Sequence, residues 1–249
     1  MNILVTNDDG FQSKGIKALI EIARGFGNVL VVAPDSARSA QSSALTVSMP
    51  ITYNEILKED NLRIISCSGT PADCVKLAFS RQLPDMDFEP DLVLSGINHG
   101  SNSSINIIYS GTMGAAIDAA LYGKLSIGFS LCDHSLNADF SFAGEYFTEI
   151  IKNTLKNGLP YGVCLNVNAP VGKIKGVKYC RQSKGAWREE FLAYPTPYGK
   201  SCFWLTGDFI NEEPHSADTD EWALNNGYIS IQPVQTDMTD YGFLENLKK

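Results

Sequence analysis

The chain has 249 residues, of which 44% are hydrophobic, and its formal net charge at pH 7 is −8. This length suffices for one large domain with a substantial core, or for two small ones. The acidic balance and the lack of a Lys/Arg run argue against nucleic acid as the main partner. No apolar run approaches the length of a membrane span, and we expect no membrane association.

The cysteines and histidines also restrict the class of protein. The six cysteines form no Cys-x-x-Cys pair, and the three histidines are scattered along the chain. This usage is typical of reduced cysteines in a cytoplasmic protein and does not favour a metal site built on His or Cys. No basic lead or small-residue cleavage site precedes the first apolar run, so we expect no export signal and a cytoplasmic location.

The first predicted element is a strand at residues 3–5, a continuous apolar run typical of a strand buried on both faces. Asn7-Asp8-Asp9-Gly10 follows it. Adjacent side chains of an extended strand point to opposite faces, so Asp8 and Asp9 can converge only if the backbone turns, which Gly10 allows. Two close carboxylates repel each other unless a cation lies between them. Taken alone, the run fits an Asx-type turn with solvated acids better.

The next stretch predicts a helix, a strand and a hairpin. The helix has Ser13 as its N-cap, apolar residues at spacing i, i+3, i+4 and i+7, and a stop at Gly25. A buried strand follows at residues 29–33. Residues 44–68 alternate apolar and polar side chains and predict an antiparallel hairpin, with one strand in the alternating run from Thr46 to Tyr53 and the other at Leu62 to Cys67.

A second helix begins within Thr70-Pro71-Ala72-Asp73, where Thr70 is the N-cap, Pro71 takes the first helical position and Asp73 closes a capping box. Apolar runs and helical spacing then predict further elements. The strands are at 91–95, 126–131 and 163–167, and the helices are at 113–121 and near 143–151.

The alternation of buried strands and helices up to about residue 168 predicts an α/β fold, a mostly parallel sheet with helices on both faces. After that the pattern changes. Residues 175–210 are aromatic, strand-like and punctuated by Gly and Pro, and a short helix and a last strand follow. With no repeats and no linker, we expect a single domain over 1–249, with a core at about 1–170 and a β-rich arm and C-terminal segment at about 171–249.

Three of the predicted strands end in small polar or acidic residues. Asp8 and Asp9 follow the first, a loop with Asp35, Arg38 and Ser39 follows the second, and Ser95 and Asn98 end the strand at 91–95. Ligands of open α/β sheets bind beyond the carboxyl ends of the strands. Carboxylates, a hydroxyl and an amide oxygen at that edge favour a hard cation such as Mg²⁺, Mn²⁺ or Ca²⁺.

A fourth segment predicts an anion site. Ser110-Gly111-Thr112 precedes a helix of small residues, and free N–H groups at a helix start bind phosphate, which Gly111 would allow to approach closely. An N-cap with close packing explains the same residues without a ligand. A cation site and an anion site at one sheet edge together favour a phosphate-handling protein.

These residues carry a resemblance to a known family. The motifs are Asn7-Asp8-Asp9-Gly10, Ala33-Pro34-Asp35 with Ser39, Gly69-Thr70-Pro71-Ala72-Asp73, Ser95-Gly96-Ile97-Asn98, Tyr109-Ser110-Gly111-Thr112, and Thr219-Asp220 with Ala223, Gly227, Ser230 and Pro233. In this order and spacing they resemble the SurE family, the stationary-phase survival protein E nucleotidases, over nearly the whole chain.

The resemblance implies a Rossmann-like three-layer αβα sandwich and a metal-dependent phosphatase that hydrolyses nucleoside monophosphates at the 5′ or 3′ position, with some activity on short polyphosphate. It implies Asp8, Asp9, Ser39 and Asn98 as the metal ligands and Ser110, Gly111 and Thr112 as the phosphate-binding turn. The oxygen donors favour Mg²⁺ or Mn²⁺ as the metal, with Ca²⁺ as a further fit. For the mechanism, our hypothesis is that either Asp8 or Asp9 takes the proton of the attacking water; the sequence does not decide which.

The resemblance also implies a homodimer or homotetramer in which a C-terminal arm is exchanged between subunits. Two residues depart from the family pattern: Ala40 replaces a usual glycine after Ser39, and Ala44 replaces a common hydroxyl residue. Both departures bear on loop shape and substrate preference. His99, beside Asn98, is expected to be an ordinary loop residue.

Other classes of protein fit less well. A receiver-type signalling domain also has paired acids after its first strand, but it needs a phospho-accepting Asp and a strand-end Lys that cannot be placed here. Phosphatases of the haloacid dehalogenase type use Asp-x-Asp, whereas Asp8 and Asp9 are adjacent. A non-catalytic metal- or nucleotide-binding module stays as the alternative; it would be stabilised by ligand without releasing phosphate.

Overall fold

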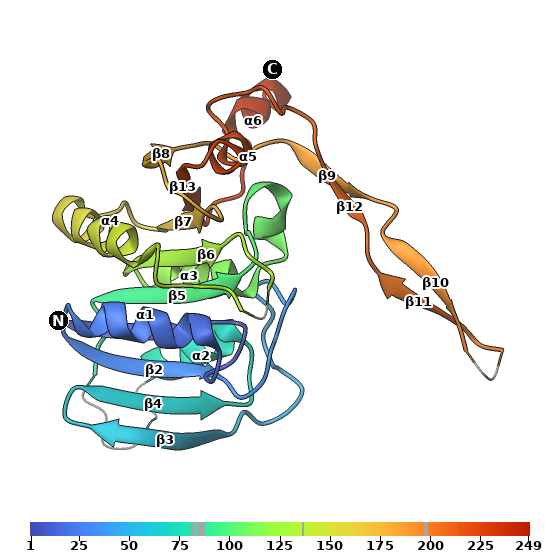
Figure 1. Ribbon diagram of the computed structural model, residues 1–249. Coiled ribbons are helices and arrows are strands. Elements are labelled where there is room, and N and C mark those ends of the chain that lie inside the picture. The colour runs from blue at the N-terminus through green and yellow to red at the C-terminus, as the bar shows by residue number, and fades with distance from the viewer. Residues whose placement is uncertain (81–82, 84–87, 136, 197–198) are drawn as a thin grey trace.

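A computed structural model describes residues 1–80, 83, 88–135, 137–196 and 199–249. It shows a three-layer body from which a long β-arm projects (Figure 1). The body contains a nine-stranded sheet in the order β3-β4-β2-β1-β5-β6-β7-β13-β8. Its strands are β1 (Asn2–Thr6), β2 (Asn28–Pro34), β3 (Tyr53–Glu59), β4 (Leu62–Cys67), β5 (Leu92–His99), β6 (Leu125–Leu131), β7 (Val163–Ala169), β8 (Val177–Tyr179) and β13 (Ile229–Gln235).

The centre of the sheet is parallel. Strands β4, β2, β1, β5, β6 and β7 run in one direction, while β3 is antiparallel to β4 at one edge. At the other side β13 is antiparallel to β7, and β8 is parallel to β13. Parallel strands bring their carboxyl ends to one edge, which is also the side from which the arm leaves the body (Figure 1). The predicted mostly parallel α/β fold is confirmed.

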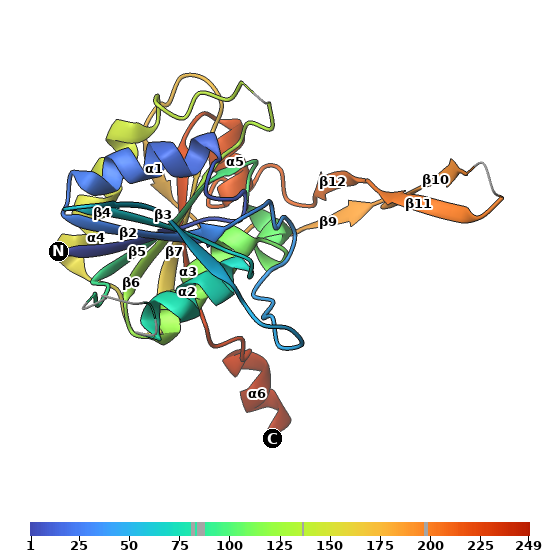
Figure 2. The same cartoon turned by 90° about the horizontal axis from the view of Figure 1, so that it is seen from below.

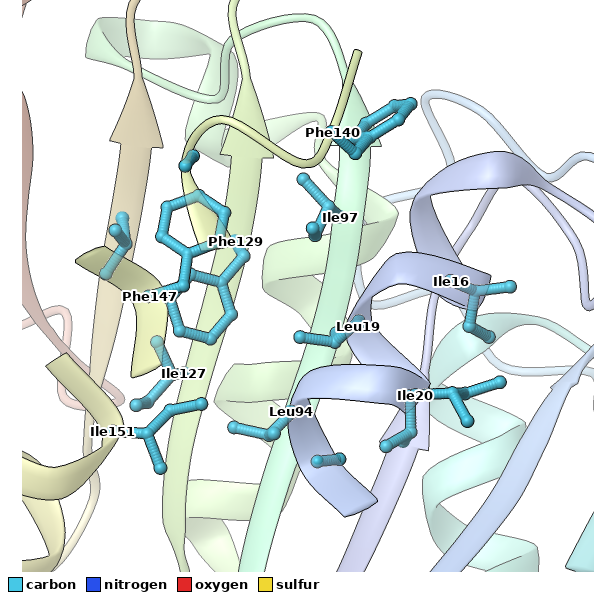
Figure 3. Packing of buried hydrophobic residues seen from close by; sticks show 14 of the residues in the cluster. Ile16, Leu19, Ile20, Leu94, Ile97, Ile127, Phe129, Phe140, Phe147 and Ile151 are labelled. Atoms are coloured by element: carbon cyan, nitrogen blue, oxygen red, sulfur yellow. The ribbon is translucent and has the colours of Figure 1, made fainter. Parts of the chain in front are cut away.

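Helices cover both faces of the sheet, as Figure 2 shows. Helices α1 (Lys14–Arg24) and α4 (Gly144–Asn157) pack on one face, and α2 (Pro71–Phe79) and α3 (Gly111–Leu121) on the other. On the first face, side chains of α1 and α4 pack against the central strands (Figure 3). The ring centroids of Phe129 and Phe147 are 4.4 Å apart. Each fully buried side chain of this size contributes roughly 1.5–3 kcal/mol to folding, so this core holds the strand ends in place.

The predicted caps are confirmed. The Ser13 side chain accepts a hydrogen bond from the Ile16 N–H and begins α1, and Gly25 ends it. At α2, the Thr70 hydroxyl accepts from the Asp73 N–H while the Asp73 carboxylate accepts from the Thr70 N–H, which is the predicted capping box. These local bonds satisfy N–H groups that a helix start otherwise leaves unpaired.

The hairpin prediction was partly wrong. Its second strand forms as expected at β4, but β4 is also parallel to β2 and so belongs to the main sheet. The first strand is β3, residues 53–59, and the alternating segment before Tyr53 is irregular. That segment is instead attached to α2, because the Thr46 N–H donates to the Asp73 carboxylate and the Thr70 hydroxyl donates to the Ala44 carbonyl.

The arm is a two-stranded ribbon in two parts. Strands β9 (Gly185–Arg188) and β12 (Asp208–Asn211) form its base, and β10 (Phe191–Pro195) and β11 (Ser201–Leu205) form its outer part. Two short helices follow, α5 (Asp220–Asn225) beside β13 and α6 (Tyr241–Leu247), which extends away from the body in Figure 2. No helix within the described part of the chain is long and apolar enough to cross a membrane.

Candidate active site

The turn after β1 is built by Asn7 and Gly10. The Asn7 side-chain amide donates to the Gly10 carbonyl (3.0 Å) and to the Ser13 hydroxyl (2.9 Å), and its oxygen accepts from the Gly10 N–H. Gly10 has φ +95°, a conformation that a side chain disfavours. The turn predicted from the Asp-Asp-Gly run therefore forms, and it links the end of β1 to the N-cap of α1.

Asp8 is a buried carboxylate at the end of β1, with 5% of its surface exposed. The Thr112 hydroxyl donates to its Oδ1 at 2.5 Å. Burial raises the pKa of the Asp8 carboxyl to about 6; the Thr112 hydroxyl opposes this shift, and the charge of neighbouring Asp9 adds to it. Without a cation, the charged form of Asp8 is therefore less favourable in this site than in water.

Asp9 lies beside the end of β5. Its Oδ2 accepts the His99 N–H at 3.2 Å, and burial raises the pKa of its carboxyl while that hydrogen bond lowers it. Strand β5 continues to His99, so Asn98 belongs to a strand and not to the loop expected after residue 95. An irregularity in the pairing with β6 between Ser95 and Asn98 marks the point where the glycine-rich run had predicted the strand to end.

The orientation of Asn98 suits a cation ligand. Its side-chain N–H₂ group donates to the carbonyls of His99 (3.2 Å) and Gly100 (2.9 Å). Both donors are therefore used by the backbone, which leaves Oδ1 to act as an acceptor. His99 itself contacts the Phe140 ring edge-on with its imidazole, at 4.7 Å between ring centres, and meets Asp9 through its backbone.

Ser39 is exposed and lies on the loop after β2. The loop is held next to Asp8, because the Arg38 N–H donates to the Asp8 carbonyl at 2.7 Å. Ala40 after it adopts φ +58°. Glycine enters this region freely, whereas alanine does so at a cost of roughly 1–2 kcal/mol. The departure at Ala40 thus acts on the loop that carries Ser39.

The N-terminus of α3 packs directly against Asp8. A Cβ atom added at Gly111 would lie 2.8 Å from the Asp8 Cβ, so only glycine permits this approach. Ser110 is the N-cap, and its hydroxyl accepts the Met113 N–H. The Thr112 hydroxyl is occupied by Asp8. The side chains of Ser110 and Thr112 therefore organise the helix start and the carboxylate, and a phosphate at this place would meet the backbone at Gly111.

The residues present fit a hard divalent cation. Within the described residues, no three or more His, Cys, Asp or Glu side chains gather as a metal-binding group, so the donor set here is two carboxylates with neutral oxygens. Burial raises the pKa of both the Asp8 and the Asp9 carboxyl, a cost that a cation bound between them would offset. An all-oxygen set with few protein charges suits Mg²⁺ or Mn²⁺.

Sequence reasoning missed several contacts at this site. The Thr112 hydroxyl on Asp8 joins residues 104 positions apart, and the His99 N–H on Asp9 joins residues 90 apart. Hydrogen bonds between residues so far apart in the chain cannot be predicted from the residues that neighbour each of them in the sequence. The one signal that pointed toward them was the occurrence of small polar residues at several strand ends, which predicts a shared edge but not the pairing across it.

Fold and site together define an α/β protein of the Rossmann-like class with two acidic residues, Asp8 and Asp9, at the carboxyl edge of its sheet beside a helix N-terminus. The family model "Survival protein SurE" matches residues 3–189. The chain is 48% identical over 247 residues to "5'-nucleotidase SurE" of Phocaeicola vulgatus, covering 99% of this chain and 95% of that protein. It is 51% identical over 249 residues to the protein of the same name from Flavobacterium johnsoniae, covering 98% and 95%.

A solved structure shows the same fold. The crystal structure of SurE protein from Aquifex aeolicus superposes with a TM-score of 0.83 at 37% sequence identity, covering 100% of this chain and 98% of that one. The chain belongs to the SurE family, as the motifs had predicted.

Proposed function

We propose that this protein is a metal-dependent 5′-nucleotidase that hydrolyses nucleoside monophosphates to nucleoside and phosphate. The observation that carries the proposal is the buried Asp8 carboxylate packed against the glycine start of α3, with Asp9 beside it. The names of its relatives, "5'-nucleotidase SurE", support the same activity. We also propose activity on nucleoside 3′-monophosphates and on short-chain polyphosphate.

Asp8, Asp9, Ser39 and Asn98 would hold Mg²⁺ or Mn²⁺. Such a cation polarises a phosphoryl oxygen and lowers the pKa of a bound water. Thr112 keeps Asp8 in one orientation through its hydroxyl. Backbone N–H groups at the start of α3, around Gly111, stabilise the negative oxygens of the phosphoryl group. Asp8 or Asp9 takes the proton of the attacking water.

A phosphate-release assay tests this activity. The panel contains 5′- and 3′-nucleoside monophosphates and short polyphosphate, each with Mg²⁺, Mn²⁺ or Ca²⁺ and after exhaustive chelation. We expect release from nucleoside monophosphates that chelation abolishes and added metal restores. Activity that survives chelation would contradict the metal site. Stabilisation by a nucleotide without any release would favour a binding module instead.

The titration of Asp8 predicts how metal affects stability. Its folded-state pKa of about 6 lies above the ordinary value of 3.8 for an aspartate, so the metal-free fold loses stability as pH rises through this interval. A cation between the carboxylates removes that penalty. We expect Mn²⁺ to raise Tm by about 5 °C more at pH 7.5 than at pH 5, as measured by scanning calorimetry. Equal shifts at both pH values would contradict the assignment of Asp8 as a ligand.

We further propose that the protein forms a homodimer or homotetramer in which the arm is exchanged between subunits. In support, the outer arm exposes large apolar side chains with no cover in the single chain, namely Phe191, Leu192, Tyr194, Phe203, Trp204 and Leu205. Exposed apolar patches of this kind are typical of protein–protein contacts. Light scattering would measure the molar mass, which we expect to fall for Trp204→Glu if the arm makes the contact.

The cytoplasm is the compartment that we propose. All six cysteines are free thiols, including Cys67 and Cys74, which contact each other. Thiols so close to one another persist in a reducing environment.

A further inference from the structure

A cluster of buried polar groups lies between the site and the base of the arm. It connects the loop between β5 and α3 with β7, with the first residues of the arm and with α5. Its members are Asn102, Ser103, Ser104, Asn166, Asn168, Ser183 and Asp220, all at least nine-tenths buried. Buried polar groups that are hydrogen-bonded rigidify the segments that they join. Ser183 takes part through its backbone N–H and carbonyl, while its side-chain hydroxyl has no partner among the described residues.

Asp220 joins three of these segments. It is fully buried, and its carboxylate accepts three backbone N–H groups, from Ser104 (2.8 Å), Ser183 (2.9 Å) and Glu221 (2.8 Å). The Ser104 hydroxyl also donates to the Ser183 carbonyl at 2.9 Å. Hydrogen bonds to a carboxylate are about twice as strong as those between neutral groups. Asp220 thus connects the site loop, the base of the arm and α5 through hydrogen bonds to its carboxylate.

The loop that Asp220 holds connects the two halves of the site. It leaves β5 after His99, the residue that follows Asn98, and enters α3 at Ser110, through the short 3₁₀ helix η1 (Ser104–Ile108). Ser104 has φ +52°, which a residue with a side chain adopts only when its surroundings impose it. The Asp220 and Ser183 bonds supply that restraint.

Two further contacts fix the same loop. On the sheet side, the Asn102 N–H donates to the Asn168 side chain at 2.7 Å. On the arm side, the Trp187 indole N–H donates to the Asn106 side chain at 2.9 Å. The base of the arm therefore touches the site loop at two places, through Ser183 and through Trp187.

We propose that Asp220 is a positioning residue for phosphoryl transfer: its carboxylate fixes the loop from Gly100 to Ser110 against the base of the arm, and the loop fixes the start of α3 relative to Asn98. This inference rests on the proposed function of the site. The Asn98 backbone is held by the pairing of β5 with β6, and of the described loop residues its side chain contacts only the first, Gly100. Loosening the loop therefore shifts the phosphate-binding backbone more than the metal ligands, and a misplacement of about 1 Å costs about 10²-fold in rate.

The test uses Asp220→Asn in the full-length protein. Asparagine keeps the size but replaces one acceptor oxygen by a donor group, so the N–H of Ser104 or of Ser183 loses its partner. We expect kcat for a nucleoside monophosphate to fall about 10- to 100-fold, while the metal concentration for half-maximal activity stays within about twofold. Trp187→Phe, a milder change, should lower kcat by a smaller factor. The double variant should lose less than the product of the two, because both act on one loop.

The matched control is Thr154→Val on α4. Thr154 is also buried, and its hydroxyl donates to the Ile150 carbonyl, but it lies on the helix layer away from the loop. It should lower Tm and leave kcat near that of the unchanged protein. An equal loss of kcat in Thr154→Val and Asp220→Asn would overturn the inference, because the effect would then be one of general stability.

Amide hydrogen exchange, measured without metal or nucleotide, separates this inference from the proposed function. In Asp220→Asn we expect exchange in peptides covering residues 100–112 to accelerate at least about tenfold, with β1 and β6 unchanged. Unchanged exchange at 100–112 would overturn the positioning role, whatever the activity. If the unchanged protein releases no phosphate from any substrate, yet Asp220→Asn shows this local acceleration, the result would contradict the proposed function while supporting the role of Asp220 in holding the loop.

Discussion

Asp8→Asn is expected to abolish metal-dependent phosphate release and to leave the fold intact. The substitution keeps the size of the side chain and an oxygen that can accept from Thr112, but it removes the charge that a cation needs. Loss of a partner outside the ligand shell already costs 10–100-fold in metal affinity or activity, so loss of a ligand should lower kcat/KM by at least about 100-fold. Excess Mn²⁺ should not restore it.

Although Asp8→Asn should lose activity, its metal-free form should be more stable than the metal-free unchanged protein. At pH 7.5, above the Asp8 pKa of about 6, the metal-free protein buries a carboxylate in its charged form. Asparagine avoids that cost, so the free energy of unfolding of the metal-free variant should rise, on the order of 1–3 kcal/mol. Urea unfolding at pH 7.5 with a chelator measures it.

A control for Asp8→Asn is Asp91→Asn. Asp91 is exposed and lies next to the first residue of β5, at the opposite edge of the sheet, where its carboxylate accepts the Asn2 N–H at 2.8 Å. It should retain activity. Full activity of Asp8→Asn with excess metal would contradict the site assignment, as would a comparable loss in the control.

Gly111→Ala is the second substitution with a large expected effect. A Cβ atom here would lie 2.8 Å from the Asp8 Cβ and 3.0 Å from its Oδ2. Either Asp8 turns away from Thr112 or the start of α3 moves back, and both changes separate the carboxylate from the phosphate-binding backbone. We expect kcat/KM to fall about 100-fold and the free energy of unfolding to fall by roughly 1–3 kcal/mol.

Gly144→Ala is its matched control. Gly144 is likewise the first residue of a helix, α4, but the nearest atom to an added Cβ there is the Ile22 Cδ1 at 4.0 Å. The alanine has room and should leave activity unchanged, with stability equal or higher by up to about 1 kcal/mol. If Gly111→Ala retained the activity of the unchanged protein, the close packing of α3 on Asp8 would not matter for catalysis.

Much of the fold followed from local signals. The cap at Ser13, the capping box of Thr70 and Asp73, and the buried strand at residues 3–5 were each predicted and each confirmed. These signals work because they depend on residues within one turn of helix or one short strand. The alternation of such elements then leaves few topologies, since parallel strands need a crossover through a helix.

The errors occurred where distant parts of the chain decide the structure. The segment from Thr46 to Tyr53 has the alternation of a strand, yet its backbone is attached to α2 at Asp73. Strand β5 continues past the glycine of Ser95-Gly96-Ile97 because β6 and Asp9 provide partners for its last residues. Helix α6 was not predicted, although Tyr241, Leu244 and Leu247 follow at helical spacing; none of its residues is buried.

The sequence by itself determined the family, the parallel sheet and the set of polar residues at its carboxyl edge, because each depends on short motifs and on their order. Only the tertiary structure decided how these residues are used. It directs the Thr112 hydroxyl to Asp8, the His99 N–H to Asp9 and the Asp220 carboxylate to the loop between Asn98 and Ser110. These contacts join residues about 90 or more positions apart, and their partners are selected by packing in three dimensions, which no local pattern encodes.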